Sequence, residues 1–182
     1  MENIVTAQGR GATENHETKW VNNSDPHFPC NKIQQEFEIQ YQCYQMQTSW
    51  MLTLFKYDFE KVISECQKSR KDMILVCFRS LGRDTAGHTL RNPQKILMIC
   101  NKVPNRFGYF DECISGADNV IVDFWGSKLR DQAASLCRML PEESKKLCYI
   151  GLTNRLHGIF SNQAQIIQSC QYFEDKFKNL CI

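Results

Sequence analysis

The chain has 182 residues, of which 42% are hydrophobic and 23% are charged, and its formal net charge is +2. This composition is typical of a folded domain and excludes an intrinsically disordered chain, which would have fewer apolar residues and a larger net charge. The dispersed basic residues do not favour a nucleic-acid partner. The sequence has no run of about 18 apolar residues, so we expect no membrane-spanning helix.

Residues 1–29 form a polar segment, which we expect to be a flexible N-terminal arm. It has no apolar stretch long enough for a signal peptide. We therefore expect a mature chain from which a secretory leader has been removed. Asn22-Asn23-Ser24 matches the sequon for N-glycosylation, which fits secretion but leaves open whether Asn22 carries a glycan.

Ten cysteines follow the arm, and no two of them are closer than eleven positions. Structural zinc sites usually contain closely spaced cysteine pairs, so this pattern argues against a structural metal and favours five disulfides. Disulfides persist in oxidising compartments, which predicts a secreted, extracellular protein. The cysteines are Cys30, Cys43, Cys66, Cys77, Cys100, Cys113, Cys137, Cys148, Cys170 and Cys181.

The spacing of the cysteines predicts an internal duplication. Successive gaps of 13, 23, 11 and 23 residues are followed by gaps of 13, 24, 11 and 22. The stretch CNKIQQEF at Cys30 recurs as CNKVPNRF at Cys100. We therefore expect two tandem copies of about 70 residues, at 30–99 and 100–182, the second ending in a closing C-terminal helix.

Apolar residues recur three and four positions apart, which predicts helices and an all-α, disulfide-stapled bundle. In the first copy one long helix is expected from Trp50 to Cys66, capped by Thr48 or Ser49. In the second copy the corresponding helix is expected over residues 118–138.

Three further signals place the ends of helices. Gly82 through Gly87, in SLGRDTAGH, is expected to be a flexible break that joins the two copies. Asn92 followed by Pro93 predicts a helix over 94–102, and Asn162 is expected to cap the matching helix. Pro141 predicts the start of a helix that runs to about residue 156 or 158.

Two disulfides can be predicted from distance. Cys66 and Cys77 would lie about 16 Å apart in one continuous helix, whereas a disulfide requires Cα atoms within roughly 7 Å. If they bond, the chain must reverse between them, so we predict helix corners stapled by Cys66–Cys77 and by Cys137–Cys148. The other six cysteines could pair within a copy or between copies.

The sequence contains no catalytic or nucleotide-binding motif. The acid pairs Asp111-Glu112 and Glu142-Glu143 are sequential on expected helices, where neighbours point in different directions. Oxidised cysteines leave no thiolate nucleophile. We therefore expect a protein that is not an enzyme and that carries no cofactor, metal or catalytic residue. The histidines are His16, His27, His88 and His157.

Aromatic residues are frequent, and at helical spacing in a small bundle we expect them to be core residues. Lining of a lipid-binding cavity is the alternative interpretation. The residues in question are Phe55, Tyr57, Phe59, Phe124, Trp125, Phe173 and Phe177.

Each copy opens with a cysteine–tyrosine–cysteine element: Cys30, Tyr41 and Cys43, then Cys100, Tyr109 and Cys113. The tyrosine precedes the second cysteine by two residues in the first copy and by four in the second. Over residues 30–181 this pattern resembles the BICYCLE proteins of aphids, salivary effectors associated with gall formation. The resemblance implies an insect protein secreted in saliva and delivered into plant tissue, and it implies no catalytic residues.

The function expected from this resemblance is that of a non-enzymatic effector that binds an unknown host protein or other macromolecule. The alternative is a saposin-like secreted protein that binds lipid or membranes, although saposins space their first cysteines more closely. A nematode-type cysteine-rich helical domain is a third interpretation. Residues 34–36 and 104–106 differ between the copies and are predicted to be positions where function lies.

Overall fold

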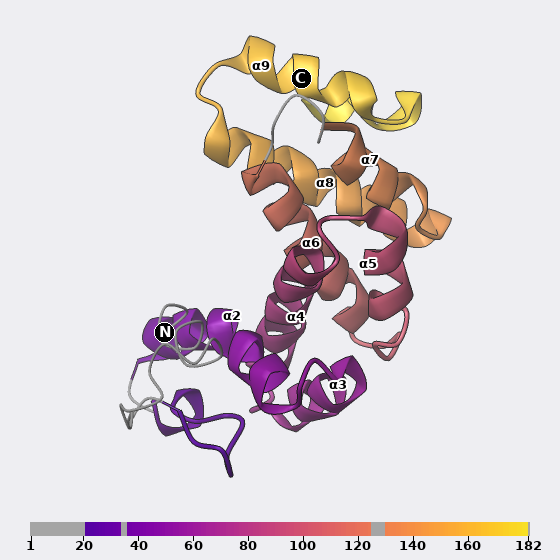
Figure 1. Cartoon of the computed structure of the whole chain (residues 1–182). Helices are drawn as coiled ribbons and strands as arrows, with labels where there is room; N and C mark the ends of the chain where they lie inside the picture. The colour runs from indigo at the N-terminus through magenta and orange to yellow at the C-terminus, as the bar shows by residue number, and fades with distance from the viewer. Residues whose placement is uncertain (1–20, 34–35, 125–129, 182) are drawn as a thin grey trace.

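The structure, a computed structural model, describes residues 21–33, 36–124 and 130–181 (Figure 1). Within these ranges it is helical and has no strand, which confirms the predicted all-α class. The α-helices are α2 (Phe37–Leu54), α3 (Phe59–Lys68), α4 (Ile74–His88), α5 (Pro93–Cys100), α6 (Tyr109–Asp123), α7 (Arg130–Arg138), α8 (Glu142–Ile159) and α9 (Gln163–Ser169). Short 3-10 helices are η1 (Cys30–Lys32), η2 (Cys170–Tyr172) and η3 (Asp175–Cys181).

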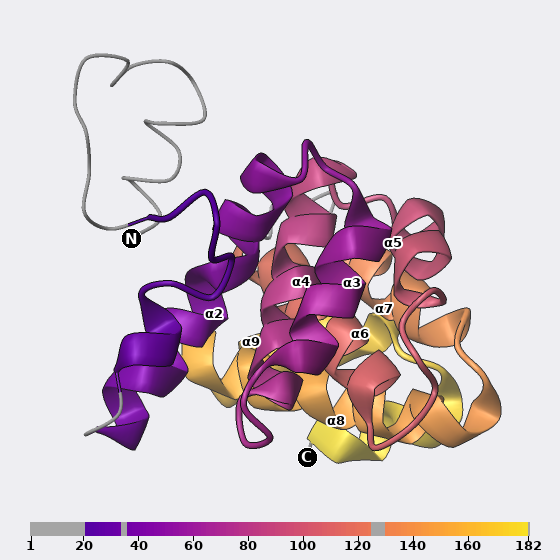
Figure 2. The same ribbon diagram turned by 90° about the horizontal axis from the view of Figure 1, so that it is seen from below.

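Helices α4 and α6 pack against each other at the centre of the molecule. Helices α2 and α3 contact α4 on one side, and α8 contacts α6 on the other, with α7 and η3 packed on α8. Figure 1 and Figure 2 show this order from two directions. The buried apolar residues form one cluster that extends through both ends, and all ten cysteines belong to it.

The expected flexible break at 82–87 is wrong, because these residues lie inside the continuous helix α4. A Cβ added at Gly82 would overlap the backbone carbonyl of Cys113, and one added at Gly116 would overlap the carbonyl of Arg79. The two glycines therefore allow the backbones of α4 and α6 to approach closely. Here glycine serves helix packing instead of chain flexibility.

The single helix expected from Trp50 to Cys66 is also wrong. Helix α2 ends at Leu54, and Lys56 and Tyr57 adopt left-handed backbone conformations with φ of 53° and 62°. Asp58 then caps α3 by accepting a hydrogen bond from the Lys61 amide. Two left-handed residues terminate a helix, so the apolar pattern here is shared between two helices.

The residues expected to cap that helix, Thr48 and Ser49, lie inside α2 instead. Both hydroxyls donate to the Asp84 carboxylate of α4, Thr48 Oγ1 at 2.7 Å and Ser49 Oγ at 3.1 Å. Their short polar side chains therefore join two helices and do not begin one.

The matching helix expected over 118–138 is divided as well, since α6 ends at Asp123 and α7 begins at Arg130. Trp125 lies outside the described residues. The expected aromatic core is confirmed for Phe173 and Phe177, whose rings lie 4.7 and 4.6 Å from that of buried Tyr149. It is wrong for Tyr57 and Phe124, which are exposed because they follow the ends of helices.

The helix starts predicted at Asn92, Pro141 and Asn162 are confirmed. Asn92 Oδ1 accepts from the Lys95 amide at 3.0 Å, with Pro93 at the first position of α5. Asn162 Oδ1 accepts from the Ala164 amide at the start of α9. Pro141 directly precedes α8, which continues to Ile159.

All ten cysteines are paired, and each disulfide joins two cysteines adjacent in the series. The pairs are Cys30–Cys43, Cys66–Cys77, Cys100–Cys113, Cys137–Cys148 and Cys170–Cys181, with Cα–Cα distances from 5.4 to 6.4 Å. The two predicted corner disulfides, Cys66–Cys77 and Cys137–Cys148, are confirmed. The other three pairings resolve alternatives that the spacing left open.

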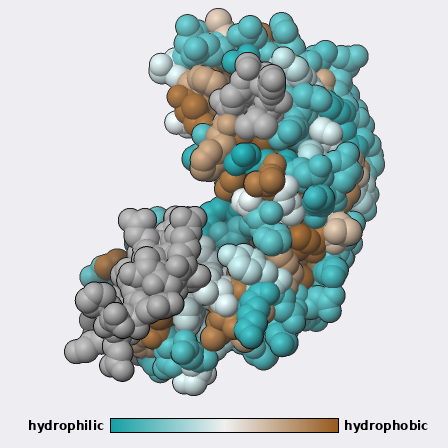
Figure 3. Space-filling view, in the orientation of Figure 1, coloured by the Kyte–Doolittle hydropathy of each residue, from teal (hydrophilic) through white to brown (hydrophobic). Residues whose placement is uncertain are grey.

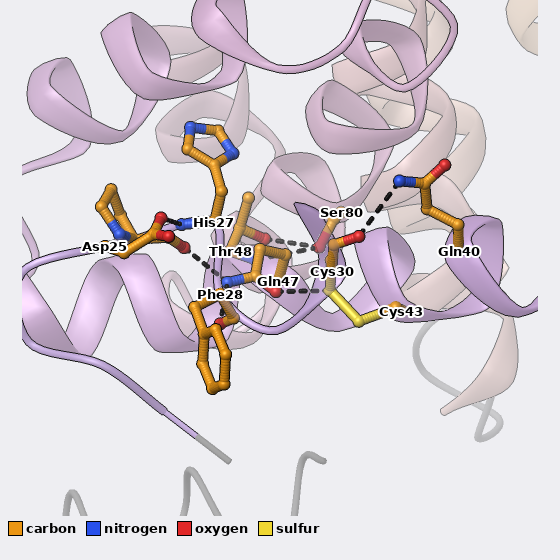
Figure 4. The surroundings of a disulfide bond; sticks show 10 residues. Asp25, His27, Phe28, Cys30, Gln40, Cys43, Gln47, Thr48 and Ser80 are labelled. Atoms are coloured by element: carbon orange, nitrogen blue, oxygen red, sulfur yellow. Dashed lines mark hydrogen bonds between the residues drawn. A yellow bond between two sulfur atoms is a disulfide. The ribbon is translucent and has the colours of Figure 1, made fainter. Parts of the chain in front are cut away.

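Of the predicted arm 1–29, the structure describes residues 21–29, which lead into η1. Two buried amide side chains of α2 hold this segment: Gln47 Nε2 donates to the Phe28 carbonyl at 3.2 Å, and Gln40 Nε2 donates to the Cys30 carbonyl at 3.1 Å (Figure 4). The side chain of Asn22, in the sequon, accepts from the Ser24 amide. No described helix combines the length and apolar character needed to cross a membrane.

Candidate functional site

A cavity of about 270 Å³ lies between α6 and α8, with Arg79 of α4 at its edge. Its lining is mixed, with charged, hydroxyl and amide groups beside apolar ones. The lining residues are Arg79, Asp111, Glu112, Ile114, Ser115, Asp118, Leu140, Ser144, Leu147, Cys148, Ile150, Gly151 and Asn154.

Helical spacing explains how these residues meet. Asp111, Ser115 and Asp118 are four and three positions apart, so they share one face of α6. Gly151 lies midway along the facing stretch of α8, and a Cβ added there would meet no atom within 4 Å. The missing side chain leaves open the space that the cavity occupies.

An ion pair forms one edge of the cavity. Arg79 Nε lies 2.6 Å from Glu112 Oε2, and Arg79 Nη1 donates to the Tyr41 hydroxyl at 3.1 Å. Burial disfavours the charge of Arg79, but Glu112 and Tyr41 outweigh this, so the pKa of Arg79 is raised. The contacts with Glu112 and Tyr41 therefore fix the position of the guanidinium group.

The two tyrosines of the cysteine–tyrosine–cysteine elements occupy different environments. Tyr41 reaches the cavity edge through its contact with Arg79. Tyr109 is buried and stacks on Phe78, with ring centroids 4.8 Å apart. The structure therefore brings one of the two near the candidate site and places the other in the core.

Asp118 is the most unusual residue of the cavity, because only 2% of it is exposed and no charged group pairs with it in the described chain. Its Oδ2 lies 2.8 Å from Cys148 Sγ and 3.4 Å from Cys137 Sγ, while Oδ1 has no hydrogen-bond partner. Burial raises the pKa of Asp118 well above its usual value. Disulfide sulfurs carry no hydrogen, so a hydrogen bond here requires the proton to sit on Asp118.

Sequence reasoning missed Asp118, although a signal for it exists. Ile114, Ala117, Ile121 and Val122 surround it at helical spacing and are all buried. A carboxylate placed on the apolar face of a helix is costly unless it has a partner or is neutral. Such a position in an apolar stripe marks a candidate functional group.

Comparison with known proteins identifies no relative. Protein-family models, curated proteins and solved structures give no match to this chain. What the chain does must therefore be inferred from its own residues, above all from those around Asp118.

Atoms of the type that can bind metals come together in the described chain at Asp118, Cys137 and Cys148, within 4.8 Å of one another. Both sulfurs, however, are bound to each other in a disulfide. The thiolate is the form of cysteine that binds metals. In the oxidised protein the group therefore offers a carboxyl and no sulfur ligand.

The remaining predicted positions lie away from the cavity. His88 stacks on Tyr57 with ring centroids 5.1 Å apart, His27 lies 3.4 Å from Glu65, and His157 is exposed on α8. His16 lies outside the described residues. Of the stretches that differ between the predicted copies, Arg106 contacts Gln67, whereas residues 34–35 are outside the described chain.

Proposed function

We propose that this protein is a secreted, non-enzymatic effector that binds a host protein through the cavity between α6 and α8. The observation that carries the proposal is a cavity of mixed lining, with charged side chains, on a helical scaffold whose cysteines are all paired. In an oxidising environment the disulfides of such a scaffold persist, so the folded structure that presents the binding surface is maintained.

Secretion is supported by the disulfides. Five bridges in 182 residues are typical of extracellular proteins, because the cytosol keeps thiols reduced. The elements around Tyr41 and Tyr109 resemble those of the aphid BICYCLE proteins. This resemblance supports delivery of the protein in insect saliva into plant tissue. The host partner would then be a plant protein.

A tandem duplication accounts for the scaffold. Cys30–Cys43 and Cys100–Cys113 both close 13 residues, and Cys66–Cys77 and Cys137–Cys148 both close 11. In this proposal, helices α2 to α5 correspond to α6 to α9. The cavity lies mostly in the second copy, with Arg79 of the first copy at its edge.

The chemistry of the cavity favours a basic or donor-rich side chain as the group bound. Glu112 is neutralised by Arg79, and Asp118 is held neutral by burial, which leaves the Asp111 carboxylate as the free charge among the lining residues. A lysine or arginine of the host protein would pair with the Asp111 carboxylate.

The saposin-like alternative rests on exposed apolar side chains. Leu90 and Phe107 are each 78% exposed, and such residues could insert into a membrane. The face in Figure 3 is mostly hydrophilic, with apolar residues scattered over it, and the cavity has charged side chains among its lining residues. Co-sedimentation with neutral and anionic vesicles tests this alternative, and binding to either would favour it over the host-protein proposal.

Capture of partners from plant tissue tests the proposal with a matched pair of variants. Gly151→Trp adds a large side chain at the cavity, where a Cβ meets no atom within 4 Å, whereas Gly158→Trp adds the same side chain at an exposed position of α8. We expect one plant protein to be retained by the wild type and by Gly158→Trp and lost with Gly151→Trp. Equal retention by all three proteins would refute the cavity as the binding site.

A further inference from the structure

We propose that Cys137–Cys148 is a redox-sensitive disulfide, which a small-molecule thiol entering the cavity opens with Asp118 as general acid. The geometry points to this bond because the same cavity exposes one of its sulfur-bearing residues and holds a carboxyl against both sulfurs. The inference concerns the chemistry of the scaffold and does not depend on the proposed function.

The direction of attack follows from burial. Cys148 lines the cavity and is 7% exposed, whereas Cys137 is fully buried. In this proposal a thiolate in the cavity attacks Cys148 Sγ, and Cys137 is the leaving group. Thiol–disulfide exchange proceeds through such an attack to a mixed disulfide, and its rate depends on how readily the leaving sulfur departs.

Asp118 lies where it can protonate the sulfur that leaves in this step. A thiolate released at Cys137 would be a buried charge, which is strongly disfavoured. Asp118 Oδ2 lies 3.4 Å from Cys137 Sγ and can give its proton to that sulfur as the bond breaks. The pKa of Asp118 is raised by burial, so the proton is present at a pH where a surface carboxyl would have lost it.

The electrons and protons balance with two thiol molecules. The first thiolate forms a bond to Cys148 Sγ, the disulfide breaks, and Cys137 leaves with the Asp118 proton as a thiol. The second thiolate attacks the small-molecule sulfur of this mixed disulfide. The two small molecules leave joined to each other by a disulfide, and Cys148 takes a proton from water. Asp118 regains its proton from water, so two thiols are oxidised and one protein disulfide is reduced.

The other disulfides provide internal controls. Cys66–Cys77 also closes 11 residues at a helix corner, but both cysteines are fully buried and no described carboxyl contacts either sulfur. Cys30 Sγ lies 2.6 Å from Gln47 Oε1, and an amide has no acidic proton to give (Figure 4). We therefore expect both of these bonds to open more slowly than Cys137–Cys148.

Opening of this disulfide releases a specific part of the fold. Cys137 lies in the last turn of α7 and Cys148 in the middle of α8, so the bond fixes the corner between them. Reduction frees this corner while the disulfides around α2, α3 and α4 remain. In a chain that moves from an oxidising to a reducing compartment, the corner between α7 and α8, beside the cavity, would therefore lose its disulfide before the other corners do.

The test exposes the folded, oxidised protein to limiting 2-mercaptoethanol, quenches with acid at intervals, alkylates free thiols and maps the labelled peptides. We expect Cys137 and Cys148 to be labelled first. Asp118→Asn should slow their labelling by roughly 10²-fold, the lower end for a positioned general acid, and leave the other disulfides unchanged. Gly151→Trp should slow the same pair by blocking the cavity, and Gly158→Trp should not.

A pH series separates proton donation from a merely structural role. The rate divided by the thiolate concentration should fall as pH rises through the pKa of Asp118 in the wild type and should be flat in Asp118→Asn. The other charged groups lining the cavity are Arg79 of α4 and Asp111 and Glu112 of α6, and the α8 lining residues carry no charge. The proposal is overturned if Cys66–Cys77 opens as fast as Cys137–Cys148, or if either Asp118→Asn or Gly151→Trp leaves the rate of opening unchanged.

Discussion

Gly82 of α4 lies directly against the backbone carbonyl of Cys113 of α6, so closely that a methyl group would overlap the carbonyl oxygen. Gly116 has the same relation to Arg79 in the opposite direction. These two contacts set the distance between the central helices, to which both ends of the molecule are attached. The stability of the whole fold should therefore depend on them.

Gly82→Ala should lower the free energy of unfolding by about 2–3 kcal/mol, because the added methyl forces α4 and α6 apart. Gly87→Ala, in the same helix but exposed and with no atom within 4 Å of an added Cβ, should raise it by about 0.5–1 kcal/mol through helix propensity. Urea denaturation measures both values. Equal effects at the two positions would show that the helices are not in close contact at Gly82.

The two motif tyrosines should respond differently to loss of the hydroxyl. Tyr41→Phe removes the hydrogen bond to Arg79 and should cost about 1 kcal/mol of unfolding free energy. Tyr109→Phe keeps the ring stacked on Phe78 and should cost less. Urea denaturation of the two variants side by side gives the comparison, and a larger loss for Tyr109→Phe would contradict the assigned roles.

Asp118 should make stability depend on pH. Its pKa is raised in the folded protein, so the folded state binds a proton more tightly than the unfolded state. The proton's contribution is fully present below the unfolded pKa, and it is lost as pH rises from there through the folded pKa. Stability should therefore fall with rising pH on account of this group.

The variant Asp118→Asn isolates this effect from those of the other carboxylates. The difference in unfolding free energy, variant minus wild type, should increase as pH rises from about 4, the unfolded value for aspartate, towards neutrality. Thermal or urea unfolding across this range measures it. A difference that stays constant with pH would mean that Asp118 is ionised normally.

The cap of α5 gives a local prediction. Asn92→Ala removes the acceptor for the Lys95 amide and should cost about 1 kcal/mol, whereas Asn92→Ser retains an acceptor and should cost less. Unfolding free energies of the two variants check this, and identical losses would argue against capping by the side chain.

Local signals in the sequence predicted local structure well. The caps at Asn92 and Asn162 and the corner disulfides Cys66–Cys77 and Cys137–Cys148 follow from short-range geometry, and all four are found. The helix break at Lys56 and Tyr57 could not be read from residue type, because neither residue favours a left-handed backbone.

Features that depend on tertiary contacts were missed or misread. Gly82 suggested flexibility in sequence, but its role is set by a backbone carbonyl on another helix. The cavity depends on α6 and α8 being side by side, which no local pattern specifies. Asp118 was visible as a polar residue in an apolar stripe, but its contact with a disulfide appears only in the folded chain.

Peptide mapping of the unreduced protein measures the disulfide pairing directly, and both the fold and the proposed opening of Cys137–Cys148 depend on this pairing. We expect five bridges, each between cysteines adjacent in the series, with Cys137 joined to Cys148 and no free thiol. A bridge between two other cysteines, such as Cys43 and Cys100, or a free thiol at Cys137 or Cys148, would contradict it.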